Sequence, residues 1–297
     1  MIKNISIIFI SIFFESLPFL LLGSFISSII ETFISNEKLS KLIPKNPILG
    51  SIVGIVLGFF LPACDCAVIP ISKRLIKKKV PINVAVSFML ASPIINPVVL
   101  LSTYYAFYKT EANIFWYRLV LGILISLIIG TIMGIIYNKK IVVKNNIDDY
   151  CDCDCHNHDN EKGLKNIILS IIKHTTIDFF EVVKFLMIGA LIASLVQVLL
   201  PRNILTIFNN NKFLSIIVLM LFAYLISLCS TSDSFVGKSL SSTFSSSSIV
   251  AYLLLGPMID IKNTIILFGN YKKNFVVTLM SLIFIVIFIT SLVVVRI

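Results

Sequence analysis

Eight long apolar stretches limit what this chain can fold into, because a helix of about 20 apolar residues can cross a hydrocarbon layer of about 30 Å. They lie near residues 5–34, 48–63, 81–108, 114–138, 168–200, 213–231, 248–270 and 274–295. Only 13% of the residues are charged, whereas soluble domains usually carry about 25%. We therefore predict an all-α polytopic protein of the plasma membrane with about eight transmembrane helices.

The net charge of +10 does not indicate a nucleic-acid partner. The lysines lie in short clusters between the apolar stretches, which is typical of loops that flank a membrane. The lipid bilayer is therefore the expected partner, and the sequence is also compatible with a homo-oligomer.

Proline and polar residues interrupt the third apolar stretch. The segment Ser92-Pro93-Ile94-Ile95-Asn96-Pro97 cannot continue a regular helix without freeing backbone hydrogen-bonding groups. At membrane depth such a break is tolerated only where protein or a water-filled cavity covers it. The sequence thus predicts a broken helix beside a functional cavity.

Residues of the first half recur in the second half in the same order. The pairs, at offsets of 164 to 166 residues, are Glu15/Glu181, Gly23/Gly189, Cys64/Cys229, Lys73/Lys238, Pro93/Pro257 and Asn96/Asp260. We predict two membrane repeats, residues 1–138 and 166–297, joined by a hydrophilic linker at 139–165. Duplicated halves that each contain a broken helix are typical of secondary transporters. Four crossings in each half, which we favour, would make the repeats parallel, and an odd number would make them inverted.

The segment Cys64-Asp65-Cys66 lies between prolines at positions 62 and 70. Two thiols this close can hold one soft, thiophilic centre. The alternative is that the cysteines pack as small apolar side chains. We predict that a substrate-binding cavity is lined by Cys64, Asp65, Cys66, Asn96, Cys229 and Asp260.

Glu15 and Glu181 lie inside apolar stretches, where a carboxylate is costly unless it faces the bundle interior and has a partner. We predict a role in proton coupling or as a counter-charge for substrate. Two alternatives remain open. Both residues could lie near the membrane surface, or Lys184 could pair with Glu181 within one helix, which would make that site structural.

The linker contains a cluster of soft-metal ligand types, namely Cys151, Cys153, Cys155, His156 and His158. Cysteine and histidine bind zinc and copper ions. We predict a flexible loop that captures or senses such an ion, although no cofactor is required for the core function. The alternative is an acidic linker whose cysteines have no such role.

The stretch Leu61–Pro70, followed by Ala91–Pro97, resembles the predicted permeases of the YraQ and ArsP type. The resemblance covers almost the whole chain, including the segment Gly256–Asp260. It implies a permease of the inner membrane, and some members of this family export trivalent organoarsenicals.

These observations predict a secondary permease rather than an enzyme, exporting a trivalent organoarsenical or another thiophilic metal or metalloid species. The chain lacks the Gly-x-x-x-x-Gly-Lys-Ser/Thr motif of ATP-hydrolysing proteins. Two alternatives remain: a permease for an unrelated small solute with structural cysteines, and a membrane thiol oxidoreductase that uses Cys64 and Cys66.

Overall fold

The structure is a computed structural model, and it describes residues 2–33, 44, 46–61, 64–108, 112–137, 141–143, 164–199 and 212–294. Within these ranges the regular elements are α-helices, and a single antiparallel β-bridge joins Val143 to Tyr271. The first half contains α1 (Ile2–Phe33), α3 (Pro47–Phe60), α4 (Val68–Lys77), α5 (Ile82–Ile95), α6 (Pro97–Phe107) and α7 (Ala112–Ile136). The second half contains α8 (Leu164–Leu199), α10 (Lys212–Ile226), α11 (Ser232–Leu240), α12 (Ser246–Met258), α13 (Ile261–Asn270) and α14 (Lys273–Val294).

Six helical segments among the described residues are long and apolar enough to cross a membrane. They are Lys3–Ile29, Ile82–Phe107, Asn113–Ile136, Ile171–Leu199, Ser246–Asn270 and Lys273–Val294. The apolar helices α3 and α10 have only 14 and 15 residues, which corresponds to about 21–23 Å of helix. The all-α polytopic fold is confirmed. The expected count of about eight crossings includes two helices that are too short to cross alone.

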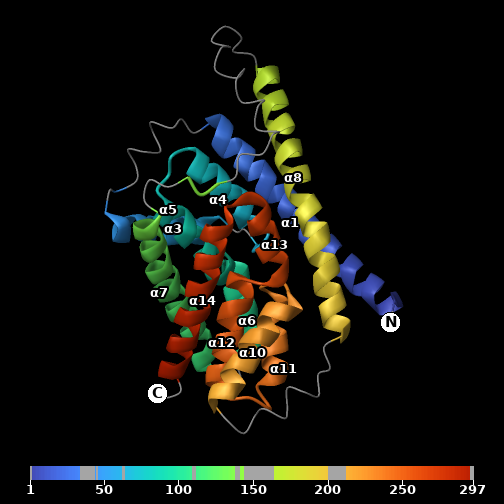
Figure 1. Cartoon of the computed structure of the whole chain (residues 1–297), viewed down its shortest axis with the longest axis vertical. Coiled ribbons are helices and arrows are strands. Elements are labelled where there is room, and N and C mark those ends of the chain that lie inside the picture. The colour runs from blue at the N-terminus through green and yellow to red at the C-terminus, as the bar shows by residue number, and fades with distance from the viewer. Residues whose placement is uncertain are drawn as a thin grey trace.

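Each half therefore contributes three of the long segments, and matching helices of the two halves meet in antiparallel pairs. Thr175, near the start of α8, donates a hydrogen bond of 3.0 Å to Ser28, near the end of α1. At the opposite ends of these two helices, Ile12 packs with Ala190 and Ala193. Figure 1 shows α1 in blue and α8 in yellow crossing beside the rest of the protein.

The helices α7 and α14 are also antiparallel. Tyr137, at the end of α7, donates a hydrogen bond of 2.9 Å to the carbonyl oxygen of Asn274, at the start of α14. The helices α5 and α12 form a third contact between matching elements. Inverted halves would produce this arrangement, whereas the duplication itself stays a prediction.

Small residues allow α5 to be enclosed between α3 and α7. A Cβ atom at Gly54 of α3 would collide with the carbonyl oxygen of Val84, and one at Gly58 would lie 3.0 Å from the backbone nitrogen of Ser92. Close approach of backbones at small residues is a general means of packing helices in membranes. Every residue of α5 is buried as a result.

The two broken segments lie at corresponding places in the halves. α5 ends at Ile95 and α6 begins at Pro97, and the side chain of Asn96 accepts a hydrogen bond of 3.0 Å from the backbone N–H of Val98. α12 ends at Met258, and Asp260 accepts a bond of 2.6 Å from the N–H of Asn263 in α13. Each polar side chain therefore caps the helix after the break and replaces backbone partners that the break removes.

Candidate functional site

Two non-helical segments bring the cysteines to the centre of the molecule. Cys64, Asp65 and Cys66 occupy the segment between α3 and α4, where the carbonyl oxygen of Cys64 accepts a 3.0 Å hydrogen bond from the N–H of Ala67. Cys229 lies in the corresponding segment between α10 and α11. That segment begins at Ser227, whose φ of 51° is in the left-handed region that side chains other than glycine seldom adopt.

These segments border one small cavity. Its lining includes Cys64, Asp65, Cys66, Cys229 and Glu15, together with Lys262. The cavity volume is about 10 Å³, room for roughly one water molecule. The three thiols therefore border one space that is too small for a larger solute without movement of the walls.

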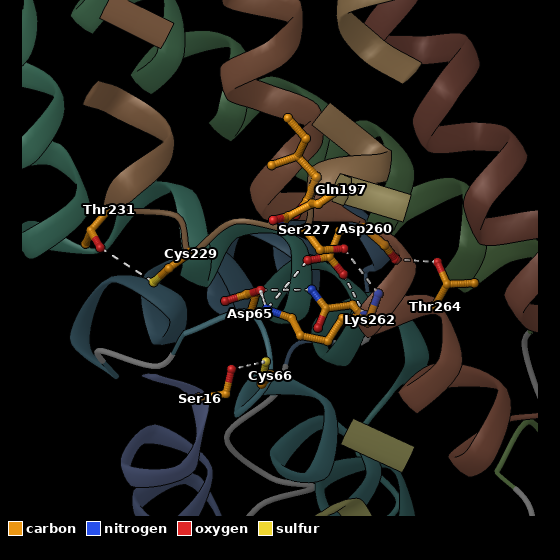
Figure 2. A network of polar contacts seen from close by, with 12 residues as sticks. Ser16, Asp65, Cys66, Gln197, Ser227, Cys229, Thr231, Asp260, Lys262 and Thr264 are labelled. Carbon is orange, nitrogen blue, oxygen red and sulfur yellow. Dashed lines mark hydrogen bonds and ion pairs between the residues drawn. The ribbon is translucent and has the colours of Figure 1, made fainter. Parts of the chain in front are cut away.

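A buried ion network forms one wall of the cavity, and its members are drawn in Figure 2. The ammonium of Lys262 lies 3.2 Å from a carboxylate oxygen of Asp65 and 3.7 Å from one of Asp260. Asn263 also donates a hydrogen bond of 3.1 Å to Asp65. The side chains of Asp65, Asp260 and Lys262 are at most 3% exposed. Because buried charges require partners, this network joins the first half to the second.

Two of the thiols, those of Cys66 and Cys229, are held in their neutral form. A hydrogen bond with Cys64 is the largest cause that raises the pKa of Cys66, and burial is the second. The positive charge of the nearby Lys262 partly offsets both effects. Burial raises the pKa of Cys229 to about 11. Both cysteines lie in connecting segments outside the six long apolar segments. A soft centre that binds these sulfurs must therefore displace their protons.

The remaining predicted substrate and coupling residues lie in different places. Glu15 is exposed at the cavity, and Asp260 reaches it only through Lys262. Asn96 caps α6 and is not among the cavity-lining residues. Glu181 forms an ion pair of 2.6 Å with Lys73 of α4, a partner on another helix that the sequence did not indicate.

Lys262 and a second buried cation, Arg118, were not predicted from the sequence as site residues. Its guanidinium is fully buried and donates hydrogen bonds of 2.7 Å to Thr103 and 2.8 Å to Ser234. Burial raises the pKa of the nearby Asp233, in α11, to about 8, against the opposing effect of Arg118. A single basic residue inside an apolar stretch was the available signal for both cations.

The predicted metal cluster of Cys151, Cys153, Cys155, His156 and His158 lies outside the described residues. Within the described ranges, no group of three His, Cys, Asp or Glu side chains lies close enough together to hold a metal ion. A centre bound by all three cavity thiols would therefore require them to move towards one another.

Comparison with known proteins places the chain in a family. UPF0718 protein YcgR of Bacillus subtilis (strain 168) is 39% identical over 287 residues, covering 97% of this chain and 95% of the relative. A Streptococcus mutans protein (serotype c, strain ATCC 700610 / UA159), named "Putative two-component membrane permease complex subunit", is 35% identical over 269 residues, or 91% of this chain and 87% of the relative. No solved structure matches. The model of the ArsP_1 family, described as "Predicted permease", matches residues 1–295, and the chain therefore belongs to this family of membrane permeases.

Proposed function

We propose that this permease is a secondary transporter of the cell membrane that exports a small thiophilic species, with trivalent organoarsenicals as the first candidates. The observation that carries the proposal is the shared cavity of Cys64, Cys66 and Cys229, to which the α3–α4 connection of one half and the α10–α11 connection of the other contribute thiols. Sulfur ligands select soft centres, and the reported permease family supports transport.

The proposed binding step is an exchange of oxygen for sulfur. An organoarsenical with two hydroxyl groups reacts with the thiols of Cys64 and Cys66, forms two As–S bonds and releases two water molecules. The thiol protons go to the leaving hydroxyl groups, which suits a Cys66 thiol that is neutral before binding. The reverse reaction with two water molecules releases the substrate.

Cys229 offers a way to pass the arsenic between the halves. Its sulfur replaces that of Cys64 on the arsenic, and the proton of Cys229 moves to the departing sulfur of Cys64. The number of As–S bonds stays constant in this step, so it needs no oxidant or reductant. Glu15, exposed at the cavity, is our candidate for accepting the protons that couple transport.

Uptake of trivalent methylarsenical into everted membrane vesicles tests the proposal. We expect uptake by the wild type, loss of uptake by Cys64→Ser/Cys66→Ser, and little change when Cys151, Cys153 and Cys155 of the linker are replaced by serine as a matched control. Immunoblotting verifies that each variant reaches the membrane.

Normal uptake by Cys64→Ser/Cys66→Ser would contradict transport through these thiols. No uptake by the wild type, in sealed and energised vesicles that contain the protein, would remove organoarsenicals from the proposal.

A further inference from the structure

Two charge pairs that correspond in sequence have different environments in the structure. Lys73 of α4 and Glu181 of α8 form an ion pair of 2.6 Å, with side chains 6% and 11% exposed. Their counterparts in the other half are Lys238 of α11, 165 positions after Lys73, and Glu15 of α1, 166 positions before Glu181. The ammonium of Lys238 lies 5.6 Å from the ring centroid of Phe107, which is on α6.

Glu15 faces the cavity and is exposed. In the described part of the chain, no ion pair joins Glu15 to Lys238. An ionised carboxylate inside an apolar membrane helix needs water or a cationic partner. The position of Glu15 therefore suits a residue that has access to water in one state and a partner in another.

Helix packing has the same asymmetry as the charges. α1 packs against α4, and α8 packs against α13. Among the described residues, no comparable packing joins the matching elements, α8 to α11 or α1 to α6. In Figure 1 α13 lies next to α8, whereas α11 lies in the lower part of the molecule, near α12.

Two matching glycines show that the pair of helices α1 and α8 is not placed symmetrically between the two halves. A Cβ atom at Gly23 would lie 2.6 Å from the Cβ of Ala67, whereas one at Gly189 would lie 3.0 Å from the Cα of Lys262. A symmetric arrangement would place both glycines against equivalent residues. Val98 corresponds to Lys262 at an offset of 164, yet Val98 is 57% exposed and Lys262 is 2% exposed.

Halves related by inverted repeats can exchange their conformations, so that each half adopts in one state what the other half adopts in the second. We propose that the pair of helices α1 and α8 switches between two docking positions on the rest of the protein. The switch separates Lys73 from Glu181 and brings Lys238 to Glu15. It opens the cavity on the side of α4 and closes it on the side of α11.

Exchange of one ion pair for its counterpart also keeps the two states close in free energy. Separation of a buried pair is costly when neither charge gains a new partner. Formation of the Lys238–Glu15 pair offsets the loss of the Lys73–Glu181 pair, so both states can be populated. This inference rests on the proposed transport function and identifies the gate on each side of the thiol cavity.

Cross-linking between introduced cysteines tests the exchange without any substrate. The six native cysteines are replaced by serine, and the pair Glu15→Cys/Lys238→Cys is compared with Lys73→Cys/Glu181→Cys. A short thiol-reactive cross-linker is applied to native membranes, and mass spectrometry identifies the products. The pair Glu181→Cys/Lys238→Cys, which meets in neither state, gives the background.

We expect both matching pairs to cross-link well above this background. Cross-linking at positions 73 and 181, combined with only background cross-linking at 15 and 238, would overturn the proposal. Because this readout needs no substrate, it separates failure of the gate from failure of thiol-mediated transport.

A second experiment keeps the cavity thiols native. In a variant whose three linker cysteines are replaced by serine, membrane-impermeant maleimide labels Cys64 and Cys66 from either side of the membrane. Lys73→Gln/Glu181→Gln is expected to speed labelling from the side of α4, because the described state loses its ion pair. Addition of Glu15→Gln is expected to slow it again, because the alternate state then loses its own pair.

If the Lys73–Glu181 pair had only a structural role, adding Glu15→Gln would not slow the labelling again. Labelling that is unaffected by the added Glu15→Gln change would therefore overturn the exchange.

Discussion

The substitution Lys262→Met tests the buried ion network. The ammonium of Lys262 lies 3.2 Å from Asp65 and 3.7 Å from Asp260, and all three side chains are at most 3% exposed. The Oδ2 atom of Asp260 has no hydrogen-bond partner among the described residues. Methionine has nearly the same length as lysine, so the change removes the charge, leaves little empty space, and strands two carboxylates in the interior.

The size of the effect follows from this arrangement. Removal of one partner of a buried ion pair costs about 3–5 kcal/mol. At about 2 °C per kcal/mol, a value suited to a large domain, the thermal unfolding temperature falls by about 6–10 °C. The additional change Asp65→Asn removes one of the stranded carboxylates, so Lys262→Met/Asp65→Asn should recover part of this loss.

The purified protein is heated in detergent to a series of temperatures, and size-exclusion chromatography measures how much folded protein remains at each. The midpoint of the loss gives the shift in unfolding temperature. Lys273→Met is the matched control, because Lys273 is exposed at the start of α14. A shift for Lys262→Met no larger than that of the control would refute the conclusion that this cation holds the two carboxylates.

Three further predictions concern packing, the second buried cation and the thiols. Gly54→Val forces a side chain against Val84 and should destabilise the protein by about 1–3 kcal/mol, measured by the same thermal assay. Arg118→Met removes hydrogen bonds to Thr103 and Ser234, each contributing about 1.5–3 kcal/mol, and should lower the unfolding temperature without preventing membrane insertion, as checked by membrane fractionation. The pKa of Cys229, raised to about 11 by burial, leaves little reactive thiolate at neutral pH. The rate of its alkylation by iodoacetamide should therefore still rise steeply between pH 9 and 10. The rate for a thiol introduced by Ser239→Cys, at an exposed site on α11, should level off over the same range.

Much of the fold could be predicted from the sequence, because the membrane restricts the options. Apolar length indicated the long segments, and prolines at 93 and 257 indicated the breaks, since proline removes a backbone donor. Length did not distinguish a crossing helix from the short α3, because the apolar stretch at 48–63 is longer than the helix, which ends at Phe60.

The site was predictable only in part, because several of its contacts depend on tertiary packing. Two cysteines near prolines indicated the cavity segment, and the repeat pattern added Cys229. The partner of Glu181 could not be read from spacing, because Lys73 lies 108 positions away and reaches it through packing of α4 on the second half. Asn96 and Asp260 share a capping role, but the contact of Asp260 with the buried Lys262 arises from tertiary structure and could not be read from the sequence.

The central claim is that Cys64 and Cys66 hold one soft centre together, and intact mass spectrometry tests it most directly. The purified protein, with its three linker cysteines replaced by serine, is incubated with a trivalent monophenyl arsenical. We predict a single adduct whose mass equals that of the arsenical minus two water molecules, retained in Cys229→Ser and lost in Cys64→Ser/Cys66→Ser. An unchanged adduct in the Cys64→Ser/Cys66→Ser variant, or none in the protein with all cavity thiols present, would contradict the account.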